Sequence, residues 1–163
     1  MHIKINNKFL SIGNYKVKCS IGKRGIAIKK REGDFITPRG KFRIMYALYR
    51  KDRIPALETI IKKTVIKKDM GWCDDPASVK YNKLIRFPFI NSAEKLHKRD
   101  NTYDIILVLN YNAKPIKRNK GSAIFIHISK KNYQKTAGCI AIKKSHLKKI
   151  LKKINKKTVV EIA

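Results

Sequence analysis

Alternation of apolar and polar residues dominates the chain and predicts a protein built mainly from β-strands. Two alternating runs, residues 2–6 and 15–20, flank Gly13-Asn14 and predict a hairpin that turns at this dipeptide. The apolar, β-branched run at 105–111 is typical of a central strand. Further strands are expected over residues 25–29, 41–49, 123–128 and 158–162.

Helical periodicity is clear in one place, close to the end of the chain. Apolar residues recur there at the i, i+3, i+4 and i+7 spacing that forms one stripe of a helix, namely Leu147, Ile150, Leu151 and Ile154. Ser145 precedes the stripe and is the expected N-cap. A second, short helix is predicted over residues 92–98, with Ser92 as its cap.

The segments between these elements carry turn chemistry. Gly33-Asp34 and residues 37–40 are rich in turn-forming residues. Residues 69–82 contain glycine, proline and paired acids, and they predict a long ordered loop. The order of apolar and polar residues over 54–68 is ambiguous and predicts no particular element.

The composition is that of a globular domain. The chain has 163 residues, of which 43% are apolar and 31% charged, so it has enough apolar mass for a core. Its longest apolar run, residues 105–109, is too short to cross a bilayer, and we expect no transmembrane segment. Since no repeat or linker divides the chain, we predict one domain over residues 1–163 with a mainly β (α+β) fold.

The charge is strongly positive and unevenly distributed. Forty Lys and Arg against eleven Asp and Glu give a net charge of +29, and residues 105–160 hold fifteen Lys or Arg but no acid. This excess indicates an anionic partner, such as nucleic acid, acidic lipid or an anionic polymer, or it reflects only the Lys- and Ile-rich usage of AT-rich coding sequences. Arg and aromatic residues are scarce in this half and we find no recognition motif, so we expect no nucleic-acid partner.

Three cysteines, Cys19, Cys73 and Cys139, cannot all pair within one chain. Their spacing matches neither a zinc site nor a redox pair, and we expect Cys19 and Cys73 to be buried free thiols rather than a disulfide. Residues 1–10 alternate and contain no apolar signal core. The chain is therefore expected to be cytoplasmic, exported by a signal that this sequence lacks, or trimmed.

Cys139 and His127 form the candidate catalytic pair. On the predicted strand 123–128, His127 lies on the face opposite the isoleucines, and along 139–142 the same is true of Cys139. If these segments are neighbours in the sheet, the isoleucines share a core and the imidazole and thiol share the other face. An imidazole within reach of a thiol is the minimum requirement for a cysteine nucleophile.

The surroundings of this pair favour an activated thiol. An acid-free, Lys-rich half of the chain would lower a thiol pKa from its usual value of about 8.5. Gly138 allows a tight turn, and the N–H groups of Gly138 and Cys139 would then stabilise an oxyanion. We expect Thr136 to hydrogen-bond within the turn, and a backbone carbonyl or an Asn to orient the imidazole. The alternative is that both residues are inert members of a core.

The ordered motifs resemble those of the YkuD-type L,D-transpeptidases. Residues 121–127, which end in His127, and the run Thr-Ala-Gly-Cys at 136–139 look like the family's catalytic signature, a His upstream of a Ser/Thr-x-Gly-Cys turn. Upstream segments that resemble family motifs are Gly33-Asp34, 37–42, and 71–76 together with Tyr81-Asn82. The resemblance extends from about residue 33 to the final helix, which is most of the chain.

The resemblance implies a YkuD-like β-sandwich or barrel with one helix near its C-terminus, acting on peptidoglycan stem peptides in the cell envelope or periplasm. Family enzymes attack the carbonyl of the third, L-centred residue of a tetrapeptide stem, form a thioester, and pass the acyl group to the amine of a second stem. By position, Cys139 matches the nucleophile, His127 the general base, Gly138 the turn glycine, and the Ile128 carbonyl the group that orients the imidazole. The expected substrate contacts are Thr136, Ala137, Trp72, Tyr81 and Asn82. We expect a monomer without cofactor or metal.

Three departures from the family pattern matter for the reaction. Most members have a His immediately before the Gly-Cys pair and an Arg two residues after the Cys, whereas this chain has Ala137 and Ala141. The spacing between His and Cys is also shorter than usual. The acyl acceptor can therefore be water instead of an amine, which would make the enzyme an L,D-carboxypeptidase.

Other classes fit less well. Sortases need an Arg after the Cys, and the last Arg here is Arg118; papain-like proteases place the Cys before the His. Asp74-Asp75 with His97 and Asp104 matches no common metal-ligand spacing, and we interpret the Asp pair as part of a loop that lines the substrate groove. A non-catalytic basic protein that binds nucleic acid or an anionic cell-wall polymer is the alternative to an enzyme.

Overall fold

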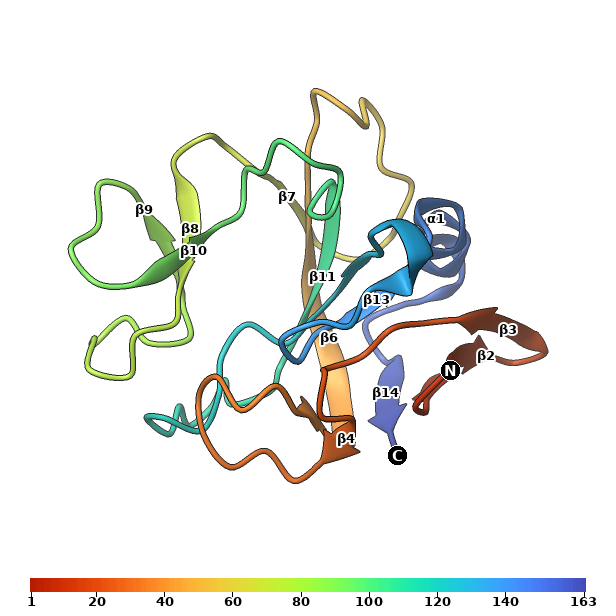
Figure 1. Cartoon of the computed structure of the whole chain (residues 1–163). Helices are drawn as coiled ribbons and strands as arrows, with labels where there is room; N and C mark the ends of the chain where they lie inside the picture. Colours follow the sequence, from red (N-terminus) through yellow and green to blue (C-terminus); the bar gives the residue numbers. More distant parts are fainter.

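A nine-stranded sheet forms the body of the protein in the computed structural model, which describes residues 1–163 (Figure 1). In spatial order its strands are β13 (Ile140–Ile142), β12 (Phe125–Ile128), β11 (Ile105–Leu109), β6 (Gly40–Tyr49), β14 (Val159–Ile162), β1 (His2–Ile5), β2 (Phe9–Ile12) and β3 (Tyr15–Lys18), with β7 (Lys63–Val65) paired beside β6. The two ends of this order meet where Ser20 and Ala141 exchange backbone hydrogen bonds of 2.8 and 2.9 Å. The sheet is thus a nearly closed barrel, and the predicted mainly β fold is confirmed.

The N-terminal hairpin differs from the prediction. Gly13-Asn14 does form a turn, but the turn joins β2 to β3, and β1 pairs with β2 through a separate turn at 6–8. The missed strand, Phe9–Ile12, alternates in burial like its neighbours. Its backbone groups pair on both sides, which the alternation of an isolated segment cannot indicate.

Two smaller sheets stand outside the barrel. One holds β10 (Ala93–Lys95), β8 (Met70–Cys73) and β9 (Leu84–Arg86), and in Figure 1 it lies to the left of the main sheet. The other pairs β4 (Ile26–Ala27) with β5 (Thr37–Pro38), so the expected turn at 37–40 begins with a short strand. The chain also has a 3-10 turn, Lys131–Tyr133.

The three-stranded sheet corrects two predictions. The segment 92–98 is not a helix, because Ala93–Lys95 pairs with β8 and gains inter-strand hydrogen bonds that a single helical turn would not provide. The segment 69–82 is not a loop throughout, since its first part is β8. Residues 54–68 are mostly irregular and contain only β7.

The predicted C-terminal helix is confirmed as α1 (Lys144–Lys153), the single α-helix. Its residues Leu147, Ile150 and Leu151 are buried. Its cap is not the predicted one: Lys143 occupies the N-cap position without a side-chain bond, and Ser145 lies within the first turn. No helix is long and apolar enough to cross a membrane.

Two hydrophobic clusters lie on opposite faces of β11 and β12. The larger fills the barrel and includes Ile126, Ile140 and the stripe of α1. The smaller lies between the outer face of these strands and the three-stranded sheet, and it contains Trp72, Phe125 and Tyr103. Because side chains alternate along a strand, residues 125 and 127 of β12 face this second cluster. The catalytic candidates lie at its edge.

Candidate active site

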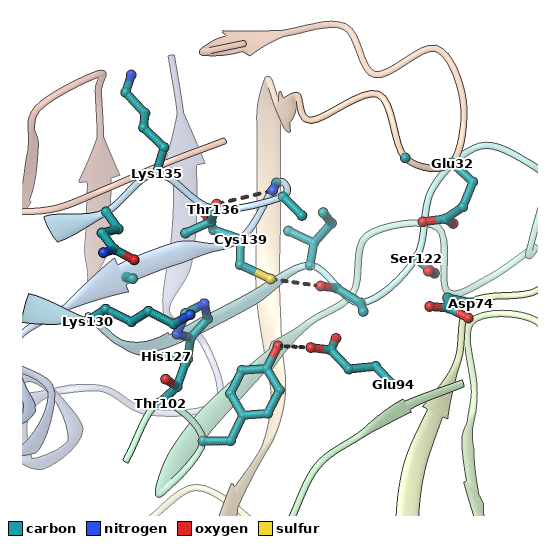
Figure 2. Close-up of a pocket in the computed structure, with 18 of the residues that line it drawn as sticks. Glu32, Asp74, Glu94, Thr102, Ser122, His127, Lys130, Lys135, Thr136 and Cys139 are labelled. Atoms are coloured by element: carbon teal, nitrogen blue, oxygen red, sulfur yellow. Dashed lines mark hydrogen bonds between the residues drawn. The ribbon is translucent and has the colours of Figure 1, made fainter. Parts of the chain in front are cut away.

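His127 and Cys139 line one cleft because β12 and β13 are parallel neighbours. Ile126 pairs with Ile140 and His127 with Ala141, so Cys139, two residues before Ala141, falls on the face that carries His127. The two residues line a single cavity of about 350 Å³ (Figure 2). The juxtaposition predicted from alternation is therefore present.

The imidazole of His127 is held in one orientation. Its Nδ1 lies 2.9 Å from the carbonyl oxygen of Ile128, and since a carbonyl can only accept, Nδ1 carries the proton and Nε2 has a free lone pair. The Tyr103 ring packs edge-on against it, with the ring centroids 5.2 Å apart. Burial lowers the pKa of His127 to about 4. The ring is therefore a neutral base at physiological pH.

The Cys139 thiol is also neutral in this geometry. It donates to the carbonyl oxygen of Ala123 at 3.0 Å and is not hydrogen-bonded to His127. Burial raises its pKa to about 12, and the carboxylate of Glu94 adds to the rise, whereas Lys29 and Lys98 act in the opposite direction. The expected lowering of the thiol pKa by the Lys-rich half is thus wrong. Loss of hydration outweighs the positive field, and the two lysines that matter come from other parts of the chain.

The turn before Cys139 requires a glycine. Gly138 has a φ of 147°, a conformation that L-residues rarely adopt, and a Cβ there would lie 3.0 Å from the backbone oxygen of Ile36. The wholly buried Thr37 supports the same turn: its hydroxyl donates to the Gly138 carbonyl and accepts the N–H of Gly22, both at 2.8 Å. The 37–40 motif therefore positions the turn that carries Cys139, which its own turn chemistry did not indicate.

Thr136 closes the turn from the other side, as expected. Its hydroxyl accepts the Gly138 N–H at 3.1 Å and donates to the Cys139 carbonyl at 2.6 Å. Of the two N–H groups expected to stabilise an oxyanion, that of Gly138 is therefore engaged, and that of Cys139 is bonded to no protein group. Ala137 is exposed beside them, and it lines the cleft together with Ala141.

Three of the expected substrate contacts lie behind the cleft rather than in its lining. Trp72 packs edge-on against Phe125 and donates from Nε1 to Oδ1 of Asn82 at 3.0 Å. Asn82 also accepts the N–H of Ala123, and the Tyr81 hydroxyl accepts the N–H of Gly121. All three side chains are buried, and they hold the backbone that forms the cleft wall.

Most polar side chains that line the cleft had not been assigned to the site from the sequence. Figure 2 shows Lys130 and Lys135 on one side of the sulfur and Glu32, Asp74 and Ser122 on the other. Glu94 lies between, where it accepts hydrogen bonds from Tyr103 at 2.8 Å and Lys98 at 2.9 Å. Only Asp74 had been expected near the groove. Glu94 lies on β10, where a helix had been predicted, and the side chains of Glu32, Ser122, Lys130 and Lys135 had been given no place in the site.

The remaining cysteines and acids have other surroundings. Cys19 and Cys73 are free and buried, as predicted. Asp104, considered above as a metal ligand, is buried in ion pairs with Arg53 at 2.9 Å and Lys144 at 3.0 Å. No group of three or more His, Cys, Asp or Glu side chains is arranged to hold a metal ion.

A cysteine on a glycine turn beside a backbone-oriented histidine is the arrangement that a cysteine nucleophile requires. In a comparison with protein families, the family model of the L,D-transpeptidase catalytic domain, YkuD, matches residues 4–162. The chain belongs to this family, whose members act on peptidoglycan. A search of curated proteins returned no significant match.

Proposed function

We propose that this protein is a cysteine acyltransferase that cleaves peptidoglycan stem peptides through a thioester on Cys139 and passes the acyl group to an amine of a second stem. The observation that carries the proposal is the shared cleft of Cys139 and His127, with Nδ1 of the imidazole bonded to Ile128 and Nε2 left as a base. Family membership over nearly the whole chain supports the reaction class.

Acylation begins from a neutral pair. The thiol hydrogen turns from the Ala123 carbonyl toward His127, and Nε2 takes the proton as Sγ attacks the carbonyl carbon of the third stem residue. The carbonyl oxygen becomes an oxyanion, for which the Cys139 N–H is a free donor. His127 then returns the proton to the departing amine, the C–N bond breaks, and a thioester remains.

Deacylation repeats these steps in reverse order. The acceptor amine attacks the thioester carbon, His127 takes a proton from the attacking nitrogen, and Cys139 leaves as a thiol when that proton returns to sulfur. The products are a new amide bond and a free enzyme, so no oxidant, metal or cofactor enters the balance.

A second candidate is L,D-carboxypeptidase activity on the same stem. Ala137 and Ala141 line the cleft beside the nucleophile, where most relatives carry His and Arg, and neither methyl group can bind an acceptor stem through a hydrogen bond. Water would then attack the thioester, and the stem would lose its terminal residue without forming a cross-link.

Mass spectrometry of isolated muropeptides incubated with the protein tests the proposal. A transpeptidase gives cross-linked dimers that lack one terminal residue, and a carboxypeptidase gives shortened monomers. The Cys139→Ala variant should give neither, and intact-protein mass should detect an acyl adduct on the wild type alone. Unchanged muropeptides with wild-type protein, together with salt-sensitive polymer binding that does not need Cys139, would overturn the proposal in favour of a binding protein.

A further inference from the structure

Two carboxylates in the cleft lack a cationic partner in a protein that has forty Lys and Arg residues. Neither Glu32 nor Asp74 forms an ion pair, whereas Glu94 in the same cleft is paired with Lys98. Glu32 accepts a hydrogen bond from the Tyr81 hydroxyl, and Asp74 accepts one from Ser92 at 2.6 Å. A carboxylate has about four acceptor positions, so both retain unused capacity.

A third polar group at this end of the cleft is unsatisfied. The Ser122 hydroxyl is buried, with the residue 6% exposed, and it has no hydrogen-bond partner. A buried polar group without a partner has a free-energy cost, because it has lost its hydrogen bonds to water. Since Ser122 lines the same cavity as both carboxylates, a ligand that bonds to all three would remove this cost.

The buried residues behind the cleft hold these three groups together. The Tyr81 hydroxyl, which donates to Glu32, accepts the N–H of Gly121 at 2.9 Å, next to Ser122. Asn82 accepts the N–H of Ala123 at 3.1 Å, and its own N–H donates at 2.9 Å to Cys73, next to Asp74. Figure 2 shows the three side chains grouped at the side of the sulfur away from Lys130 and Lys135.

From this arrangement we infer that Glu32, Asp74 and Ser122 form a subsite that binds the primary ammonium group of a stem peptide. A primary ammonium carries one positive charge and three N–H donors, which matches two free carboxylates and one hydroxyl acceptor. The opposite end of the cleft, with Lys130 and Lys135, has the charge to receive a carboxylate. The cleft is thus complementary to a peptide that carries both charges.

This inference rests on the proposed function, because the amine can belong to either stem of the proposed reaction. It is the side-chain amine of the donor stem, bound before acylation, or the amine of the acceptor stem, bound before deacylation. Both amines would make the same contacts, but binding of the donor amine would accelerate acylation and binding of the acceptor amine would accelerate deacylation. The variants below separate them.

The test compares stem peptides whose amine is free or N-acetylated, using the full chain and its E32Q/D74N variant. Gln and Asn retain an oxygen to accept from Tyr81 and Ser92, so the cleft wall keeps its hydrogen bonds. E58Q is the matched control, since Glu58 is an exposed acid paired with Lys152 on α1. In the first arm, kcat/KM for acyl-enzyme formation is measured with each donor; in the second, KM for a free-amine acceptor is measured with an acetylated donor.

If the amine belongs to the donor stem, the wild type and E58Q should prefer the free-amine donor about tenfold or more in the first arm, a size typical of a charged hydrogen-bonded contact. E32Q/D74N should reduce this preference to about twofold or less. If the amine belongs to the acceptor stem, E32Q/D74N should instead raise the acceptor KM of the second arm about tenfold or more above that of the wild type and E58Q. S122A should show part of the same effect. An E32Q/D74N variant that changes neither the donor preference nor the acceptor KM overturns the subsite and leaves the acyl-transfer proposal intact.

Calorimetric binding to the C139A protein separates the two proposals. One outcome is that the wild type turns over no stem, whereas C139A binds the free-amine stem more tightly than the acetylated one and E32Q/D74N in the C139A background removes this difference. That outcome would support the subsite and contradict the proposed reaction. If stems are neither bound nor cleaved by any variant, both proposals are wrong.

Discussion

Cys19 lies in the barrel core and Cys139 lines the cleft, yet the pKa of the two thiols is raised to the same value. Cys19 is 4% exposed in the barrel core, and its thiol donates to the Asn6 carbonyl at 3.8 Å. Cys139 is half-buried and lines the cleft with His127. Burial raises the pKa of both to about 12. Thiol acidity therefore does not distinguish the candidate nucleophile from an inert core residue; access to substrate and a neighbouring base do.

Removal of each sulfur gives the largest expected contrast. Cys139→Ala should reduce stem-peptide turnover about a thousandfold or more, since it removes the sulfur that forms the proposed thioester. Cys19→Ala should leave kcat/KM within about twofold while lowering the free energy of unfolding by about 1 kcal/mol, because it leaves a small cavity in the core. Turnover assays and denaturant melts measure the two effects. Turnover by C139A would refute the nucleophile assignment.

Substitution of the base should have the next largest effect. His127→Gln should lower kcat/KM about 10²- to 10⁴-fold, the usual contribution of a positioned general base. His146→Gln is the matched control, because His146 bonds to Tyr15 far from the cleft and should leave turnover unchanged. Equal kinetics of H127Q and wild type would contradict the base assignment.

The buried imidazole should also make stability depend on pH. The folded protein holds the pKa of His127 at about 4, below its unfolded value of about 6.5, so the unfolded state binds the proton more readily. Between pH 6.5 and 4 this group therefore lowers the free energy of unfolding as pH falls, by roughly 3 kcal/mol in total. Urea melts at pH 7 and pH 4 should show a drop that is smaller in H127Q by this amount. Identical drops would contradict the neutral, buried ring.

The smallest expected effect is the pH dependence of the rate at which iodoacetamide alkylates Cys139. With a pKa of about 12, its thiolate fraction and alkylation rate should rise about tenfold for each pH unit between 7 and 9. Peptide mass mapping should find Cys19 and Cys73 unmodified until the protein unfolds. A rate that is already constant above pH 7 would indicate a thiolate–imidazolium pair instead.

Alternation along the chain predicted that His127 and Cys139 would share one face of the sheet if their two segments were neighbours. The isoleucines of 124–128 and 140–142 predicted a shared core, and β12 and β13 are neighbours with that register. The helix stripe at 147–154 was equally clear, because an amphipathic helix repeats within one segment. Where a segment was short, as at 92–98, local propensity gave the wrong element, since pairing with β8 decided its conformation.

No periodic pattern in the sequence predicted the polar side chains that line the cleft. Glu32, Asp74 and Ser122 lie in three separate loops, and buried Tyr81 and Asn82 bring these loops together. The resemblance suggested Tyr81 and Asn82 as substrate contacts, whereas they hold the wall behind the cleft. The acidity expected from a Lys-rich half was wrong for a related reason: desolvation depends on what packs around the sulfur, not on nearby sequence.

The sequence by itself determined the strand-rich fold, the terminal helix and the choice of His127 and Cys139 as candidate residues, because these follow from periodicity within short segments and from motifs in a fixed order. Only the tertiary structure decided which side chains face the cleft, which lie behind it, and how acidic the thiol is. Those properties arise from contacts between distant segments and from the exclusion of water, and a linear pattern records neither.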